Sequence, residues 1–360
     1  MAEAQVINVD LADVWAETSR KTLLRTLSWG DEVAVTRRTN TSIEIELKQF
    51  IEAEDGSITP RLVKGHIVPR KSSGVKIGEV LVPKSENKVL RVNFVDVQQG
   101  DGSVIESPSG QIILVDGGDN QLFARYLAGR FTDTTLNEPK PIECILVSHG
   151  DADHFVGLPE IFKSETNKNP RKRLFMQPNR IYHNGIVKRP SKRNGKSLPE
   201  KELLGPTKKV GDDLFLVGLV DNLLAVPDAE MNVPFKTWKK ALAKYHKRAP
   251  LEFKRLQFGD DDAFDFLADE GIRIEVLGPV TIDISGKPAL KFLGEPPMGP
   301  RVDGDRRAGG EGSLGFAHYQ RTLDHFPPGL WQCQLSVCRR SERRGRACAG
   351  KEASGRRPQP

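Results

Sequence analysis

Residues 144–147 (Cys-Ile-Leu-Val) form a short apolar run, and this run most constrains what the chain can fold into. Apolar side chains at consecutive positions predict a strand buried on both faces, as in a parallel sheet covered by helices. Residues 90–97 and 112–115 are further apolar strands, and the spacing of residues 121–131 predicts a helix. The chain from residue 89 onward is therefore expected to be mixed α/β.

The first 88 residues have a different pattern. Apolar and Thr side chains at three- and four-residue steps from Leu11 to Leu23 predict one amphipathic helix, with an N-cap at Asn8 or Asp10. Short stretches rich in β-branched residues follow between turn formers, at residues 32–36, 42–47, 61–63 and 76–82. We therefore expect a small helix-plus-β module at residues 1–88, and we assign it no chemistry.

Composition narrows the class of protein. The 360 residues, 38% of them hydrophobic, are enough for two or three domains. The sequence has neither the roughly 18 consecutive apolar residues of a membrane helix nor a secretory signal, so we expect a cytoplasmic protein without membrane contact. Its cysteines are too few and too closely bunched for a disulfide framework and are expected to be reduced; they are Cys144, Cys333, Cys338 and Cys348.

The net charge of +6 resides entirely in the last 60 residues. Residues 1–300 are balanced, with 42 basic and 42 acidic side chains. Within them, residues 163–209 carry fourteen Lys or Arg against three acids. This basic segment either attracts a phosphate-bearing partner or forms solvated loops.

The loop after residues 144–147 carries the side chains with the most chemistry. His149, Asp151, Asp153 and His154 follow the spacing H-x-D-x-D-H, and such side chains are ligands for Zn²⁺, Mn²⁺ or Fe. His149 and Asp151 can share one metal while Asp153 and His154 face a second, and two ions about 3.5–4 Å apart activate a bridging water. The pattern predicts hydrolysis of an ester or phosphodiester. The alternative is a helix N-terminus capped by Asp, with incidental histidines.

These residues resemble the metallo-β-lactamase superfamily, and within it the branch similar to the hydrolase domain of ComEC-type DNA-uptake proteins. That branch often has H-x-D-x-D-H in place of H-x-H-x-D-H, and Gly157-Leu158 fits it too. Upstream, residues 96–101 (Asp-Val-Gln-Gln-Gly-Asp) and 116–118 (Asp-Gly-Gly) match except at Gln98, where the missing Gly strains the turn but removes no ligand. The resemblance covers residues 89–158 closely and 171–279 loosely.

The resemblance implies an αββα sandwich over residues 89–317 with two divalent ions at one edge of its sheets, zinc first and manganese or iron as alternatives. The metal ligands it implies are His149, Asp151, Asp153, His154 and His183. Asp153 is either a ligand or the catalytic proton acceptor. Asp116 and Asp101 are expected to orient the metal-binding loop. The alternatives are a plain turn Asp at position 116 and a surface-loop histidine at position 183.

The C-terminal residues depart from the family. A strand ending in Gly-Asp and a later His are not recognisable after Ala317, where the chain becomes Arg-rich and loses hydrophobic periodicity. Read one base on, residues 318–343 can be back-translated into two alternating strands that end in Gly-Asp, which we interpret as a frameshift. We therefore predict a sandwich that is incomplete in its C-terminal half, with an uncovered apolar face, and a disordered Arg-rich tail at 318–360.

Taken together, the sequence predicts a metal-dependent hydrolase of a small-molecule or nucleic-acid phosphodiester, or of another ester. Its activity is expected to be impaired by the aberrant tail, and no obligate protein partner is inferred. The first alternative is a non-catalytic remnant that holds at most one weak metal. The second is a nucleic-acid-binding module that uses the basic segment 163–209 and the tail.

Overall fold

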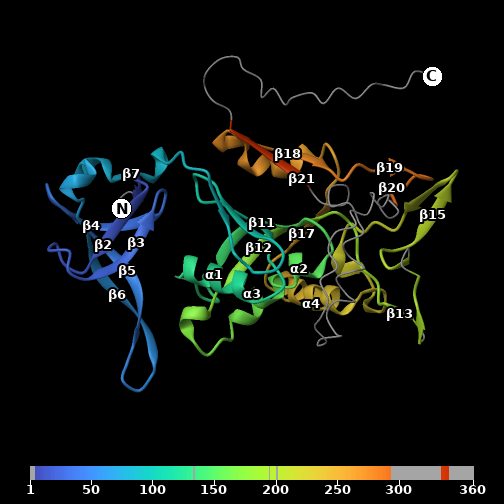
Figure 1. Ribbon diagram of the computed structural model, residues 1–360, viewed down its shortest axis with the longest axis horizontal. Helices are drawn as coiled ribbons and strands as arrows, with labels where there is room; N and C mark the ends of the chain where they lie inside the picture. Colours follow the sequence, from blue (N-terminus) through green and yellow to red (C-terminus); the bar gives the residue numbers. More distant parts are fainter. Residues whose placement is uncertain (1–4, 133, 194, 200–201, 293–333, 340–360) are drawn as a thin grey trace, which may run out of the picture.

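The computed structural model describes residues 5–132, 134–193, 195–199, 202–292 and 334–339. A β module at the N-terminal end, an α/β body in the middle and a small four-stranded sheet follow one another along the long axis (Figure 1). The predicted mixed α/β class is confirmed. None of the helices in these residues is long and apolar enough to cross a bilayer.

The N-terminal module is one seven-stranded sheet of order β3-β2-β6-β5-β4-β1-β7. Its strands are β1 (Gln5–Ile7), β2 (Leu11–Trp15), β3 (Leu23–Ser28), β4 (Glu32–Arg38), β5 (Ile43–Glu52), β6 (Ile58–Ile67) and β7 (Leu81–Pro83), followed along the chain by the short helix η3 (Lys84–Glu86).

The helix predicted between Leu11 and Leu23 is wrong, because this segment contains β2 and the start of β3. Ala12 and Val14 are buried while Leu11 is 68% exposed, which is the alternation of a strand. Strands β3 and β6 flank β2 and pair with its backbone, so tertiary pairing outweighs the helical spacing of the apolar residues.

The body is built on a six-stranded sheet of order β17-β12-β11-β10-β9-β8. Its strands are β8 (Arg91–Phe94), β9 (Gly102–Glu106), β10 (Ile112–Asp116), β11 (Lys140–Val147), β12 (Met176–His183) and β17 (Glu252–Arg255). β10, β11, β12 and β17 run parallel, whereas β8, β9 and β10 pair antiparallel. The carboxyl ends of the parallel strands therefore meet at one edge of the sheet, which is where ligands bind in open α/β sheets.

The two faces of this sheet are covered by different elements (Figure 1). Helices α1 (Leu122–Arg130), α3 (Leu158–Ser164) and α4 (Val233–Arg248) pack on one face, and η8 (Asp261–Glu270) and β18 (Ile272–Gly278) pack on the other. In β11, Ile145 and Val147 belong to the first core, and Cys144 and Leu146 belong to the second. The run is thus buried on both faces as predicted. The predicted uncovered apolar face is wrong for this central strand, whereas Val92 and Phe94 of the edge strand β8 are 42% and 86% exposed.

Short elements complete the described chain. They are α2 (Ala152–Phe155), η4 (Pro170–Lys172), β13 (Lys192–Arg193), β14 (Lys196–Ser197), β15 (Thr207–Val210), β16 (Asp213–Leu216), η6 (Leu223–Ala225), η7 (Asp228–Glu230), β19 (Ile282–Asp283) and β20 (Pro288–Lys291), with η1 (Lys71–Ser73) and η2 (Ile77–Glu79) in the N-terminal module.

In the tail, β21 (Gln334–Arg339) pairs antiparallel with β18. The prediction of disorder is wrong for these six residues, because the edge of β18 offers backbone groups for a further strand. The rest of the tail, including most of the segment interpreted as frameshifted, lies outside the described residues.

Candidate functional site

The H-x-D-x-D-H loop begins at the carboxyl edge of the six-stranded sheet. Val115 pairs with Leu146 in parallel register, so Asp116 at the end of β10 lies beside Ser148. The Ser148 backbone N–H donates to Asp116 Oδ1 at 2.8 Å, and the Ser148 hydroxyl donates to Oδ2 at 2.5 Å. Asp116 is 3% exposed and has a φ of 57°, a left-handed conformation that short polar side chains tolerate better than most.

His154 lies on α2 with its ring directed at Asp116. The His154 Nδ1 is 2.9 Å from Asp116 Oδ2 and 3.8 Å from the Oδ2 of Asp101, whose side chain is 78% exposed. Because a carboxylate only accepts hydrogen bonds, Nδ1 carries a proton, and in the neutral ring Nε2 has the lone pair. Burial lowers the pKa of His154, but the hydrogen bond that the ring donates to Asp116 and the charges of Asp116, Asp153 and Asp101 outweigh burial and raise this pKa above its ordinary value.

His149 packs against His154, with 3.8 Å between the ring centroids. Its Nδ1 is 3.0 Å from the Ser148 hydroxyl oxygen, whose proton points to Asp116. The His149 Nδ1–H is therefore the donor, and Nε2 again keeps its lone pair. Burial, followed by the neighbouring His154, lowers the pKa of His149, and the nearby carboxylates offset this only in part. The imidazole is consequently neutral at neutral pH.

Asp151 occupies the N-cap position of α2, yet its side chain makes no capping hydrogen bond. The alternative interpretation of this loop as an Asp-capped helix start is therefore wrong. One carboxylate oxygen, Oδ1, instead accepts from Lys188 Nζ, and the other, Oδ2, lies 3.7 Å from His149 Nε2. Sequence reasoning missed Lys188, which lies 37 residues from Asp151 within the basic segment.

The two remaining predicted ligands are placed differently. The negative charge of Asp153 favours the protonated form of both loop histidines, although other groups lower the pKa of His149 overall. His183 ends β12 opposite Val147, where its Nδ1 accepts from the Gly185 N–H at 3.0 Å and its Nε2 faces the Asp221 carbonyl at 3.3 Å. Burial lowers the pKa of His183 to about 4, so its ring is neutral. No described contact joins this ring to the loop, and its assignment as a metal ligand stays a prediction.

The donor chemistry of the loop fits a divalent cation. Two imidazole Nε2 atoms and the Asp151 carboxylate are all acceptors, and His149 Nε2 faces Asp151 Oδ2 without a proton between them. In the present arrangement, however, no three His, Cys, Asp or Glu side chains of the described residues converge so as to hold one ion. The structure therefore brings suitable ligands together in pairs, and one of these ligands, Asp151, is already bound to the ammonium group of Lys188.

Close backbone contacts hold the loop in place. A Cβ at Gly157 would lie 2.0 Å from the Gly117 carbonyl oxygen, and one at Gly100 would lie 1.7 Å from the Asp153 carbonyl oxygen. The Gly117 N–H donates to the His154 carbonyl at 2.7 Å. Gln98, where the resemblance leads one to expect Gly, has a φ of 70°, so the strain expected at this turn is present.

Comparison with known families bears on this same segment. Residues 95–174 match the model of the metallo-beta-lactamase superfamily, and this range contains Asp101, Asp116 and the whole H-x-D-x-D-H loop. Searches of curated proteins and of solved structures returned no match. The described architecture, with several sheets and few helices, is consistent with the α+β fold of that superfamily, and the match suggests a metal-dependent hydrolase.

Proposed function

We propose that this chain is a metal-dependent hydrolase of the metallo-β-lactamase type, which attacks a phosphodiester or another ester with water. The observation that carries the proposal is the orientation of His149 and His154. Ser148 and Asp116 bind the Nδ1 side of these rings, so that Nε2 of each neutral ring has the lone pair that a metal ion needs.

The residues would divide the work as follows. His149, Asp151 and His154 would hold the cation, zinc first with manganese or iron as alternatives. When bound, a divalent ion lowers the pKa of a water molecule and polarises the bond under attack. Asp116 fixes the orientation of Ser148 and His154, and Asp153 is proposed as the proton acceptor or as a further ligand.

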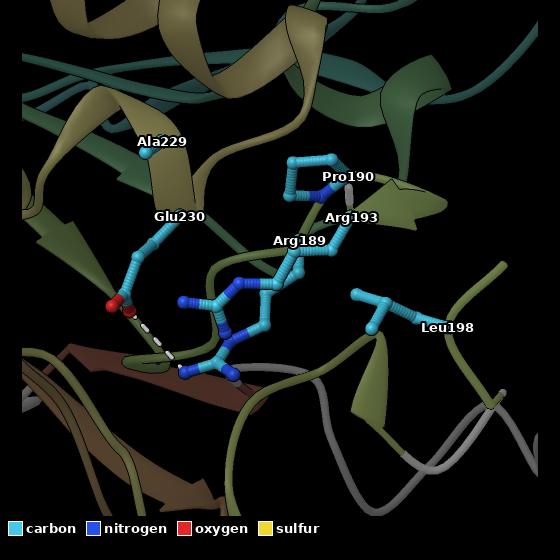
Figure 2. A pocket seen from close by; sticks show the side chains of 6 residues that line it. All are labelled: Arg189, Pro190, Arg193, Leu198, Ala229 and Glu230. Carbon is cyan, nitrogen blue, oxygen red and sulfur yellow. Dashed lines mark hydrogen bonds and ion pairs between the residues drawn. The ribbon is translucent and has the colours of Figure 1, made fainter. Parts of the chain in front are cut away.

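A phosphodiester substrate is supported by the basic side chains that follow Lys188 along the chain. Arg189, which follows Lys188, lines a small pocket together with Arg193, and Arg189 forms an ion pair with Glu230 at 3.2 Å (Figure 2). A guanidinium matches the geometry of two phosphate oxygens. The resemblance to ComEC-type hydrolase domains favours the same class of substrate, either as a small molecule or as nucleic acid.

Hydrolysis of bis(p-nitrophenyl) phosphate by the purified chain tests this function, with Zn²⁺ and Mn²⁺ added in turn. We expect turnover that a chelator removes and added metal restores. His149→Ala should lower kcat/KM by about a hundredfold, because it deletes a metal ligand. His66→Ala, in β6 of the N-terminal module, is the matched control and should leave turnover unchanged. Turnover that persists after chelation, or in the His149 variant, contradicts the proposal.

We also propose that the coding frame shifts near Ala317. The support is the sequence alone: residues 318–343 lose hydrophobic periodicity as written, and their shifted reading supplies the strand ending in Gly-Asp that the resemblance leads one to expect. Sequencing the gene through this region decides the matter, since its bases either encode those strands one base on or do not.

A further inference from the structure

Lys188 lies against the candidate metal-binding loop, and the proposed function does not use it. The segment that leads to it is well anchored, because Ile186 and Val187 are buried and the Lys188 carbonyl accepts from the Asn232 N–H at 2.9 Å. A Cβ at Gly150 would lie 3.5 Å from the Ile186 carbonyl oxygen, so this segment packs directly on the loop. The backbone at Lys188 is thus held in a defined position next to the loop.

The side chain of Lys188 is 19% exposed, and that of its partner Asp151 is 28% exposed. Partial burial weakens the screening of their ion pair by water, so the pair is stronger than one on an open surface. The ammonium takes Asp151 Oδ1, while Oδ2 faces the lone pair of His149 Nε2 at 3.7 Å. The carboxylate that would complete a metal site with the histidines is thus already paired with a cation through one of its two oxygens.

An ammonium and a divalent ion cannot share this carboxylate without cost. Like charges a few ångströms apart repel strongly where water is partly excluded. The ammonium also carries only donors, so it satisfies Asp151 but does nothing for the imidazole acceptors. A divalent ion satisfies both kinds of group, and it therefore favours an arrangement in which Lys188 has left Asp151.

We propose that Lys188 is an internal cation that competes with a divalent metal for Asp151, so that metal binding releases its ammonium from the loop. The inference rests on the proposed function for the identity of the loop as a metal site. Arg189, the next residue along the chain, lines a small pocket with Arg193 and Glu230 (Figure 2). The released ammonium would then be available to an anionic substrate only when the metal is in place.

Isothermal titration of the full chain with Mn²⁺ or Zn²⁺ alone tests the competition. Lys188→Met should bind the ion about tenfold more tightly than the unmodified chain, a typical size for coupling between two ligands. Lys192→Met is the matched control: this exposed lysine of β13 lies four residues further along, and its loss should leave the affinity unchanged. Equal or weaker affinity in Lys188→Met overturns the proposal, as does the absence of binding in all three proteins.

A second measurement uses the unmodified chain and so does not depend on the variant folding. Limited acetylation of amines, read by mass spectrometry, should label Lys188 more slowly than Lys192. Added Mn²⁺ should raise the rate at Lys188 several-fold and leave Lys192 unchanged. A rate at Lys188 that does not respond to a metal that binds overturns the proposal. The first experiment measures metal affinity and the second measures the accessibility of the Lys188 amine, and neither measures hydrolysis. If a chain gives both expected results but hydrolyses nothing, the proposed function is contradicted while the competition between Lys188 and the metal is supported.

Discussion

Asp116 links the start and the end of the H-x-D-x-D-H loop, because it binds both Ser148 and His154. Its carboxylate accepts three hydrogen bonds, from the Ser148 N–H, the Ser148 hydroxyl and His154 Nδ1. Asp116 is 3% exposed, so these three donors take the place that water molecules have around an exposed carboxylate. One side chain therefore fixes both the start of the loop and the tautomer of a histidine within it.

Replacing Asp116 by Ala should destabilise the protein, because three buried donors lose their acceptor together. At about 1–3 kcal/mol for each unsatisfied group, the free energy of unfolding should fall by about 3 kcal/mol or more. Asp116→Asn is the matched control. Its amide oxygen can still accept from the Ser148 N–H, but its NH₂ group, in the place of Oδ2, cannot accept from the Ser148 hydroxyl or from His154. The Asn variant should therefore recover only part of the loss. Urea denaturation measures both; a stable Ala variant would make Asp116 the plain turn residue of the alternative interpretation.

At the scale of residues, the sequence predicts local motifs but not contacts between residues that lie far apart along the chain. The loop ligands could be found because H-x-D-x-D-H is local and directly follows a buried strand. Lys188 could not be found, because 37 residues separate it from Asp151 and the basic segment holds fourteen Lys or Arg with no spacing that singles out one. Only the packing of residues 184–188 on the loop selects it.

At the scale of elements, the central strand of the six-stranded sheet and a helix packed on it were predicted correctly from their apolar residues. The run at residues 144–147 lies in β11, and the helix predicted at residues 121–131 is α1, which packs on the same sheet. The helix prediction for the segment from Leu11 to Leu23 was wrong because few of its side chains are apolar, so that their spacing fits a strand as well as a helix. The strands beside β2 decide the outcome, and a single segment contains no information about its neighbours.

Gly157 is the point at which α3 meets the turn after β10, and Gly157→Ala should disrupt that junction. The new Cβ would lie 2.0 Å from the Gly117 carbonyl oxygen and 2.6 Å from that of Asn120, so backbone must move. We expect a loss of about 3 kcal/mol in the free energy of unfolding, in the range of overpacked cores.

Gly129 provides the control for this substitution. It lies inside α1, and a Cβ there meets nothing within 4 Å. Gly129→Ala should therefore stabilise the protein by up to about 1 kcal/mol, since Ala favours a helix over Gly. Thermal denaturation compares the two variants, and a similar effect of both would show that the junction tolerates a methyl group.

At the scale of the whole molecule, a buried ion cluster joins the N-terminal module to the α/β body. Asp31, just before β4, accepts from Arg91 of β8 at 2.7 Å and from Arg130 of α1 at 2.6 Å. Arg130 also forms two hydrogen bonds to Glu106 of β9, at 2.9 and 3.0 Å. Sequence separations of 60 and 99 residues put these pairs beyond any local pattern. The association of the two parts is therefore specified by contacts that the sequence does not reveal.

The pH dependence of stability should report this cluster. Burial raises the pKa of Asp31, but Arg130, the Ser28 N–H and Arg91 outweigh it and hold this pKa below 3.8. A carboxylate whose pKa is lowered by folding contributes stability that is present above its ordinary pKa and is lost as the pH falls through the lower, folded value. The contribution of Asp31 is therefore complete at neutral pH and disappears in acid below 3.8.

Asp31→Asn should lower the free energy of unfolding by about 3 kcal/mol at neutral pH, because it leaves two part-buried guanidinium groups with Glu106 as their remaining carboxylate. The difference from the unmodified chain should narrow in acid, where Asp31 itself becomes neutral. Asp13→Asn is the control: this partly exposed carboxylate accepts from Thr26 at 3.0 Å, and its loss should cost less than about 1 kcal/mol. Scanning calorimetry should also show the N-terminal module of Asp31→Asn melting apart from the body. One unchanged transition at every pH would mean that other contacts hold the two parts together.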